Sequence, residues 1–351
     1  FSDYTMSRYN VDGSIDTSFG TNGSFTVFSY SDQIPTKYQL KLLSDGKILT
    51  VRMIDVNPHP NIDYMDILVN RYNNDGSLDT TFANAGHYIQ DYGDSDYGMA
   101  IEIQPDNKIL IAGRADLDAL VFRLNENGTL DTSFGTNGTF RKRYIPFDGF
   151  NYVYNFAFAV KLQSDGKIIM AGHTRSEGGT NYDIGLMRLN QNGTLDTTFA
   201  NNGILICNTN VSDKFVSMEL SPDDKISIFF NSNGSTGPLL PANPLARILR
   251  LDASGHLDTS FGVNGLLTPQ FGSLTVIYFL DSVVDADGKF VCIGMWGNGT
   301  KYIARFNFDG TLDTSFDVDG YSILPSSLDH PTLYNSNFYD LCIQSDGKIL
   351  F

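Results

Sequence analysis

The sequence predicts an all-β fold, a β-propeller of six four-stranded blades formed by one domain over residues 1–351. Two observations predict it. A unit of about 60 residues recurs along the whole chain, and Asp-Gly or Asn-Gly turns separate short apolar segments within each unit. A linear solenoid is the alternative, but solenoid repeats are usually shorter, at about 20–45 residues. The length of the unit therefore favours a radial arrangement.

One repeated phrase places Arg eight residues before an Asp-Thr pair, which a Phe follows, as in RLNENGTLDTSF from Arg123. The Leu and Phe that flank Asp-Thr are expected to wedge between blades. The Asp and Thr are expected to bond to N–H groups of the turn as side-chain caps. These aspartates are therefore predicted to be structural: Asp16, Asp79, Asp131, Asp196, Asp258 and Asp313.

A second phrase, typified by SDGKIL at Ser44, alternates with the first. Its Asp-Gly pair predicts a two-residue hairpin turn between the first and second strands of each unit. In the second repeat the predicted strands are 38–44, 47–53, 65–73 and 87–92. The remaining copies begin at Pro105, Ser164, Pro222, Ala286 and Ser345.

The lengths of the connections predict where specificity lies. The first-to-second and third-to-fourth connections are nearly constant, whereas the second-to-third and fourth-to-first connections vary. In a four-stranded antiparallel blade the variable pair falls on one face, where a propeller would carry its binding residues.

The two chain ends predict how the ring closes. Residues 3–10 resemble a third strand, and residues 339–351 resemble a first strand with the start of a second. Together they would make one closing blade, which would remove exposed sheet edges. Because the chain starts without Met and stops inside an apolar run, we expect a mature form or a fragment. A further blade or a C-terminal domain is the rival interpretation.

Composition excludes several classes of function. The formal net charge of −16 argues against nucleic acid and anionic lipid as partners, and the sequence has no apolar run of about 20 residues. The three cysteines are sparse and lie in apolar runs, which indicates buried thiols rather than a disulfide framework. Calcium is considered at turns such as 10–16, but two copies of the phrase lack the middle Asp, so no cofactor is predicted.

No catalytic or metal site is predicted. The histidines are scattered without zinc spacing, and the sequence contains no GxSxG motif and no phosphate loop. The position six residues after the repeated Lys breaks the consensus, holding Met53, Arg114, His173, Asn231 and Met295. Divergence inside a repeat indicates either a ligand site or an unconstrained position. Arg114, His173 and Asn231 are therefore candidate ligand-binding residues.

Aromatic and basic residues in the connections add further candidates. Arg143 and Tyr152 belong to a stretch in which aromatic residues surround a basic patch, and Trp296 is the single tryptophan. Exposed aromatic side chains would suit stacking on a sugar or contact with a protein partner. Packing over the blade ends is the alternative interpretation of the same residues.

The phrases GxLDTSFGxNG and QxDGKIxxAG resemble the delta-60 repeat family of bacterial β-propeller repeats, over essentially the whole chain. The resemblance implies an exported, extracellular or cell-surface protein, often carried by the type IX secretion machinery. It brings no catalytic residue with it. We therefore expect a non-catalytic binding or structural module, an adhesin or display scaffold, with a carbohydrate or protein partner. A polysaccharide-active enzyme with a channel-lining pair of carboxylates is the alternative.

Overall fold

The computed structural model describes residues 4–10, 12–28, 39–54, 65–145, 154–175, 181–209, 211–233, 245–271, 277–297, 299–324, 340–344 and 347–350. The chain divides into two compact units, Phe1–Lys142 and Arg143–Phe351, which are described separately. The described residues form antiparallel strands and turns, without a helix, which confirms the predicted all-β class.

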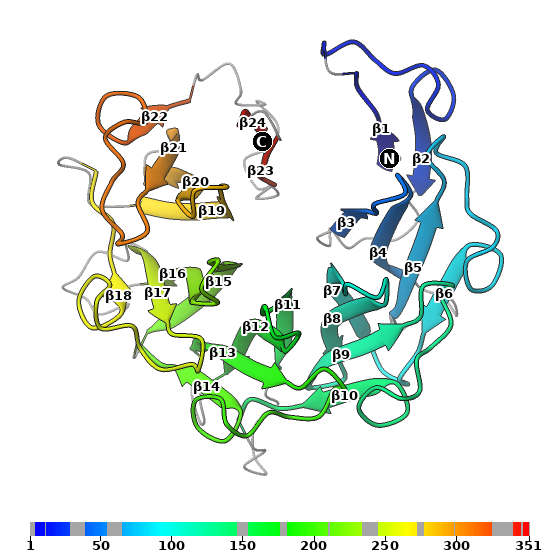
Figure 1. The fold of residues 1–351 in the computed structure, drawn as a ribbon, viewed down its shortest axis with the longest axis horizontal. Coiled ribbons are helices and arrows are strands. Elements are labelled where there is room, and N and C mark those ends of the chain that lie inside the picture. Colours follow the sequence, from blue (N-terminus) through cyan, green and yellow to red (C-terminus); the bar gives the residue numbers. More distant parts are fainter. Residues whose placement is uncertain are drawn as a thin grey trace. The chain divides into compact units, whose positions relative to one another are not determined.

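The first unit contains two complete four-stranded sheets and one pair of strands (Figure 1). In each complete sheet the strands pair in the order of the chain, so neighbours in sequence are neighbours in space. The pair is β1 (Tyr4–Ser7) with β2 (Ser24–Phe28). The sheets are β3 (Gln39–Leu42), β4 (Ile48–Ile54), β5 (Asp66–Tyr72) and β6 (His87–Gln90), then β7 (Asp96–Ile103), β8 (Ile109–Ala115), β9 (Asp118–Leu124) and β10 (Thr139–Lys142).

The second unit contains three complete sheets with the same strand order, followed by one pair. The first sheet is β11 (Phe156–Leu162), β12 (Ile168–Arg175), β13 (Tyr182–Leu189) and β14 (Ile204–Cys207). The second is β15 (Ser212–Leu220), β16 (Ile226–Asn233), β17 (Leu245–Leu251) and β18 (Leu266–Leu267). The third is β19 (Ile277–Val284), β20 (Phe290–Trp296), β21 (Lys301–Phe306) and β22 (Tyr321–Ile323), and the pair is β23 (Cys342–Ile343) with β24 (Ile349–Leu350).

These sheets are the four-stranded units of a β-propeller, and their strands lie where the sequence predicts them. The strand pairs near the two chain ends supply what one further blade needs, because β1 and β2 match third and fourth strands while β23 and β24 match first and second strands. The two pairs belong to different units, so their joining into one closing blade stays a prediction.

The first strand carries a β-bulge in four of the five complete sheets, and β3 pairs with β4 without one. The register shifts between Gly98 and Ala100 in β7, and at the same place in β11, β15 and β19. The bulge brings the backbone of β7 close to Gly113 in β8, where an added Cβ would lie 1.7 Å from the carbonyl oxygen of Tyr97. The glycine of the repeated Ala-Gly pair, Gly113 in this copy, is therefore needed because two backbones approach closely there.

Apolar side chains pack between consecutive sheets of each unit. In the first unit, Val51 and Ile67 of one sheet share a fully buried cluster with Ile111 and Phe122 of the next. In the second unit, Phe229 of β16 packs on Phe279 of β19 with ring centroids 5.3 Å apart. Within the described part of the chain, no helix has the length and apolar character needed to cross a membrane.

Candidate functional site

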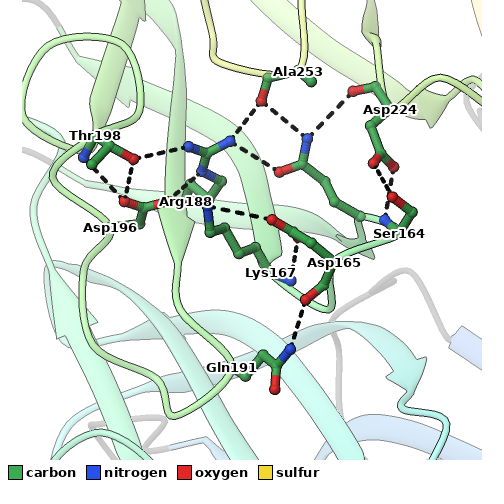
Figure 2. A network of polar contacts seen from close by, with 10 residues as sticks. Ser164, Asp165, Lys167, Arg188, Gln191, Asp196, Thr198, Asp224 and Ala253 are labelled. Carbon is green, nitrogen blue, oxygen red and sulfur yellow. Dashed lines mark hydrogen bonds and ion pairs between the residues drawn. The ribbon is translucent and has the colours of Figure 1, made fainter.

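The charged residues of the repeat form one network with each other, which Figure 2 shows around Asp196. Oδ2 of Asp196 accepts a hydrogen bond from Nε of Arg188 at 2.8 Å and lies 3.3 Å from Nζ of Lys167. Oδ1 of the same carboxylate accepts the N–H and hydroxyl of Thr198. The two repeated phrases of one sheet, which supply Arg188 and Asp196 on one side and Lys167 on the other, therefore meet at a single carboxylate.

The same arginine also connects its sheet to the next one. Nη1 of Arg188 donates to the carbonyl oxygen of Ala253 at 2.6 Å (Figure 2). Its guanidinium lies 4.8 Å above the ring centre of Phe199. The backbone N–H that follows Phe199 donates to the carbonyl of Ser254 at 2.8 Å. The Phe199 ring itself covers Gly255. The phrase from Arg188 therefore binds its own sheet internally and packs against the phrase of the sheet that follows.

This network recurs along the chain. Arg–Asp contacts of 2.6–2.9 Å join 8 to 16, 71 to 79, 123 to 131, 188 to 196, 250 to 258 and 305 to 313. The repeated Lys approaches the same aspartate at 2.7–3.3 Å in the five complete sheets. Burial opposes ionisation of Asp196, but hydrogen bonds from Thr198 and Lys167 outweigh it and lower its pKa to about 2. The repeated carboxylates are thus fixed, ionised partners of the scaffold.

The aspartates of the turns have partners close by. Oδ1 of Asp12 accepts the N–H of Ser14 at 2.9 Å, and Asp75 and Asp309 make the same bond to Ser77 and Thr311. The hydroxyl groups of Ser14, Ser77 and Thr311 also donate to these carboxylates, and the hydroxyl and N–H bonds together lower the pKa of all three carboxyl groups. An Asn accepts the bond in the copy that ends at Thr129, at 3.1 Å. One acceptor oxygen satisfies the turn, which explains why either residue type is found there.

Two candidates at the divergent position of the second strand contact the first strand of the next sheet. Nε2 of half-buried His173 accepts the backbone N–H of Phe215. Asn231, one repeat later, accepts the N–H of Phe279 at 2.9 Å and donates to its carbonyl at 2.8 Å. Both side chains satisfy backbone groups beside the bulge. The sequence diverges there, but the two residues do equivalent work in joining sheets.

Arg114 and Met53 stand at this position in the first unit. The guanidinium of Arg114 lies 4.5 Å from the ring centre of Tyr97, on the neighbouring strand β7. Met53 is buried, 8% exposed. Met295, in the second unit, is half-buried. The assignment of Arg114, His173 and Asn231 to a ligand stays a prediction.

The expectation that Trp296 is exposed is wrong. Its side chain is 6% exposed and stacks on Tyr302 with ring centroids 5.8 Å apart. It belongs to the apolar cluster between β16–β17 and β20–β21, because burying a ring of this size stabilises the fold more than a polar edge costs. Arg143 is half-buried and engaged with other groups. Tyr152 lies outside the described residues.

The pH dependence of stability should report the burial of His173. Burial, aided by the charge of Lys214, lowers its pKa to about 3, so the folded chain keeps it neutral while the unfolded chain protonates it below its ordinary value of 6.5. Between pH 6.5 and 5 this costs about 2 kcal/mol of stability. The H173Q variant, whose amide oxygen can accept the same N–H, should lose about 2 kcal/mol less between pH 7.5 and 5 by urea unfolding. An equal loss in both proteins would contradict this account.

Sequence reasoning missed a set of buried acids where consecutive sheets meet. In the second unit Asp183, the second residue of β13, and Asp213, the second of β15, are 1% and 0% exposed. Burial raises the pKa of Asp183 to about 6, and the charge of Asp213 adds to the effect. Such a pair resembles an acid–base couple, but neither carboxyl faces solvent. A recurring signal was present, because Asp stands thirteen residues before the Asp-Thr pair at Asp66, Asp118 and Asp183.

The corresponding acids of the first unit form a tighter group. Oxygens of Asp66, Asp91 and Asp96 all lie within 4.8 Å of one another. Burial raises the pKa of Asp96 to about 6, and the charges of Asp66 and Asp91 act in the same direction, against the Tyr92 N–H and Arg141. Carboxylate oxygens are the donors preferred by hard divalent cations. These three residues are the group among the described residues that could hold a metal ion.

The fold and the repeated network define this chain as a β-propeller repeat protein. Comparison with family models agrees with this class. Four stretches, 66–82, 104–134, 163–199 and 286–316, match the model described as a domain of unknown function (DUF5122) beta-propeller. Each stretch contains one or both of the repeated phrases. No curated protein matches the sequence.

Solved structures resemble the chain distantly. One is an ulvan lyase of polysaccharide lyase family PL25, at 13% identity over 82% of this chain and 69% of that chain, with a TM-score of 0.48. The α-L-arabinofuranosidase Arb93A from Fusarium graminearum has 12% identity over 82% and 80%, with a TM-score of 0.46. An α-L-arabinofuranosidase from Clostridium thermocellum has 11% identity over 84% and 95%, with a TM-score of 0.39. Likeness at this level does not extend to a reaction or a substrate.

Proposed function

We propose that this chain is a non-catalytic binding or structural module, exported to the cell surface or the surroundings of the cell. The observation that carries the proposal is the Arg–Asp–Lys network. In this network the repeated Arg, Asp and Lys pair with each other. The residues that recur in the sequence therefore stabilise the scaffold. Residues that differ between repeats are then left to carry binding.

The connections between strands support this division. The first-to-second turns are the same length in all five complete sheets: 43–47, 104–108, 163–167, 221–225 and 285–289. The second-to-third connections range from 116–117 to 234–244. In an antiparallel sheet the second-to-third connections lie at the end of the sheet opposite the first-to-second hairpin turns. Each sheet can therefore change its binding residues at the end with the variable connections without disturbing the Arg–Asp–Lys network at the opposite end.

The resemblance to delta-60 repeats supports the export half of the proposal, and the partner we propose is a carbohydrate or a protein at the cell surface. Secretion can be tested by expressing the full-length gene in its host and locating the protein in washed cells, surface fractions and medium. Recovery in the cytoplasmic fraction alone would contradict export.

Binding and catalysis can be separated in one set of experiments. The chain is applied to a glycan array, and the same polysaccharides are then incubated with it and assayed for new reducing ends and unsaturated products. We expect binding without turnover. A variant in which residues 234–244 are replaced by the chain's own short connection, Asp116-Leu117, keeps the scaffold and tests one variable connection. Its control is D165N, at the opposite end of a sheet, which keeps the oxygen that accepts the N–H of Lys167 in a constant turn.

The outcomes distinguish the two functions. Binding that falls about tenfold or more in the loop variant, but not in D165N, supports a module that binds through its variable connections. Cleavage of any polymer by the wild type would contradict the proposal and favour a polysaccharide-active enzyme. Neither binding nor cleavage would remove the binding half and leave a structural role.

A further inference from the structure

Three carboxylates converge where two sheets of the first unit meet. Asp66 begins β5, Asp91 directly follows β6 of the same sheet, and Asp96 begins β7 of the next sheet. One oxygen of each lies within 4.8 Å of the others. Asp66 and Asp96 are buried, at 4% and 0% exposure, whereas Asp91 is exposed and opens the group to solvent.

One oxygen of Asp96 is enclosed without a hydrogen bond. Its Oδ2 accepts the backbone N–H of Tyr92 at 2.6 Å, and its own N–H donates to the carbonyl of Met65 at 2.6 Å, so the residue is held firmly. Its Oδ1 is buried and has no partner among the described residues. An unsatisfied carboxylate oxygen is costly to bury, so a group that completes its shell would stabilise the fold.

The equivalent residues of later repeats do not share this open oxygen. Ten residues before the turn Asp, the second unit has Asn155 and Asp213. Oδ1 of Asn155 accepts the N–H of Tyr144 at 3.1 Å and the hydroxyl of Thr174 at 2.8 Å. Both oxygens of Asp213 accept the hydroxyl of Thr209, and one also accepts Ser232. At Asn155 and Asp213, protein groups fill the shell that is left incomplete at Asp96.

The nearby arginine does not complete the shell. The charge of Arg141 favours ionisation of Asp96, but its guanidinium donates to the carbonyl of Ala115 at 3.2 Å and lies 3.6 Å from Asp118. It also lies over the ring of Tyr92, 5.2 Å from the centroid. The guanidinium of Arg141 is thus engaged with Ala115, Asp118 and the ring of Tyr92, and the clustered carboxylates attract a further cation.

We propose that Asp66, Asp91 and Asp96 bind one calcium ion, which joins the first two complete sheets of the chain. Oxygens bound to the same Ca²⁺ at about 2.3–2.6 Å lie at most about 5 Å apart, which the observed spacing satisfies. Three converging carboxylates suit Ca²⁺ better than Mg²⁺, which keeps more of its water and usually takes one or two carboxylates. Water entering past exposed Asp91 supplies the remaining ligands.

The test uses the full chain after treatment with chelator. Isothermal titration with Ca²⁺ should show one site, and Tb³⁺ should bind there with emission sensitised by the neighbouring Tyr92 and Tyr97. The D96N variant should lower the affinity about tenfold or more, because it removes a charge and a ligand. D91N changes an exposed side chain, so its fold is retained, and it should weaken binding as well. The matched control is D213N, at the equivalent position in the second unit, which should bind like the wild type.

Thermal unfolding gives an independent readout. Calcium should raise the melting temperature of the wild type and of D213N, but not of D96N. Without calcium, D96N should melt at or above the temperature of the wild type, because it relieves repulsion among the three acids. Absence of both Ca²⁺ heat and Tb³⁺ emission in the wild type would overturn the proposal. Undiminished binding in both D96N and D91N would do the same.

Discussion

Replacement of Arg188 by alanine is expected to lower the free energy of unfolding by about 4 kcal/mol, because it leaves the buried Asp196 carboxylate with a single cation. The arginine and aspartate side chains are 6% and 5% exposed and lie 2.8 Å apart. The variant also loses the bond to the Ala253 carbonyl and the contact with the Phe199 ring, both of which join consecutive sheets. Urea unfolding followed by tyrosine and tryptophan fluorescence measures the change.

The chain offers its own control for this prediction. Arg8 contacts Asp16 at 2.7 Å in the same way, but these side chains are 32% and 21% exposed, so R8A should have a much smaller effect. R188K, which keeps the charge but not the planar fork, should fall between wild type and R188A. Equal effects of R188A and R8A would show that the network contributes little beyond exposed ion pairs.

Replacement of Gly255 by alanine is expected to destabilise the chain by about 3 kcal/mol. Two costs add: the residue has φ +89°, and an added Cβ would lie 2.5 Å from the Phe199 ring. The ring cannot retreat easily, because it is fully buried and Arg188 lies over it. Thermal or urea unfolding would measure the loss.

Gly13 separates the two costs. It occupies the same place in the first phrase with φ +82°, but no described atom lies within 4 Å of a Cβ added there. G13A should therefore show only the cost of the backbone conformation, about 1 kcal/mol. If G255A and G13A had the same effect, the contact between Phe199 and the next phrase would not constrain the glycine.

These predictions explain why the repeat is so well preserved within the chain. The Arg, Lys, Asp, Phe and Gly of the phrases contact each other within a sheet and across to the next one. A change in any of them therefore affects two sheets at once. The second-to-third connections, at the opposite end of each sheet, differ in length. At the proposed calcium site, the ion would complete the shell of Asp96, where hydroxyl groups complete the shells of Asn155 and Asp213.

The candidate site was predicted less well than the fold. Divergence at His173 and Asn231 was a correct observation, but their contacts with Phe215 and Phe279 depend on the bulge of the next sheet, which no local pattern reveals. Trp296 lies between Met295 and Gly297 in sequence, yet it is buried against Tyr302 and Tyr321. Asp96 stands 30 residues from Asp66, and only the packing of two sheets brings their oxygens together.

The sequence by itself determined the all-β class, the four strands of each unit, the tight turns and the capping role of the repeated aspartates. All of these depend on local rules: alternation of apolar residues, turn dipeptides and side chains that bond two residues along the chain. The tertiary structure decided which side chains are buried, which residues pair between sheets and where carboxylates gather. Those features depend on contacts between residues far apart in sequence, and an exposed loop and a buried sheet end can have the same local composition.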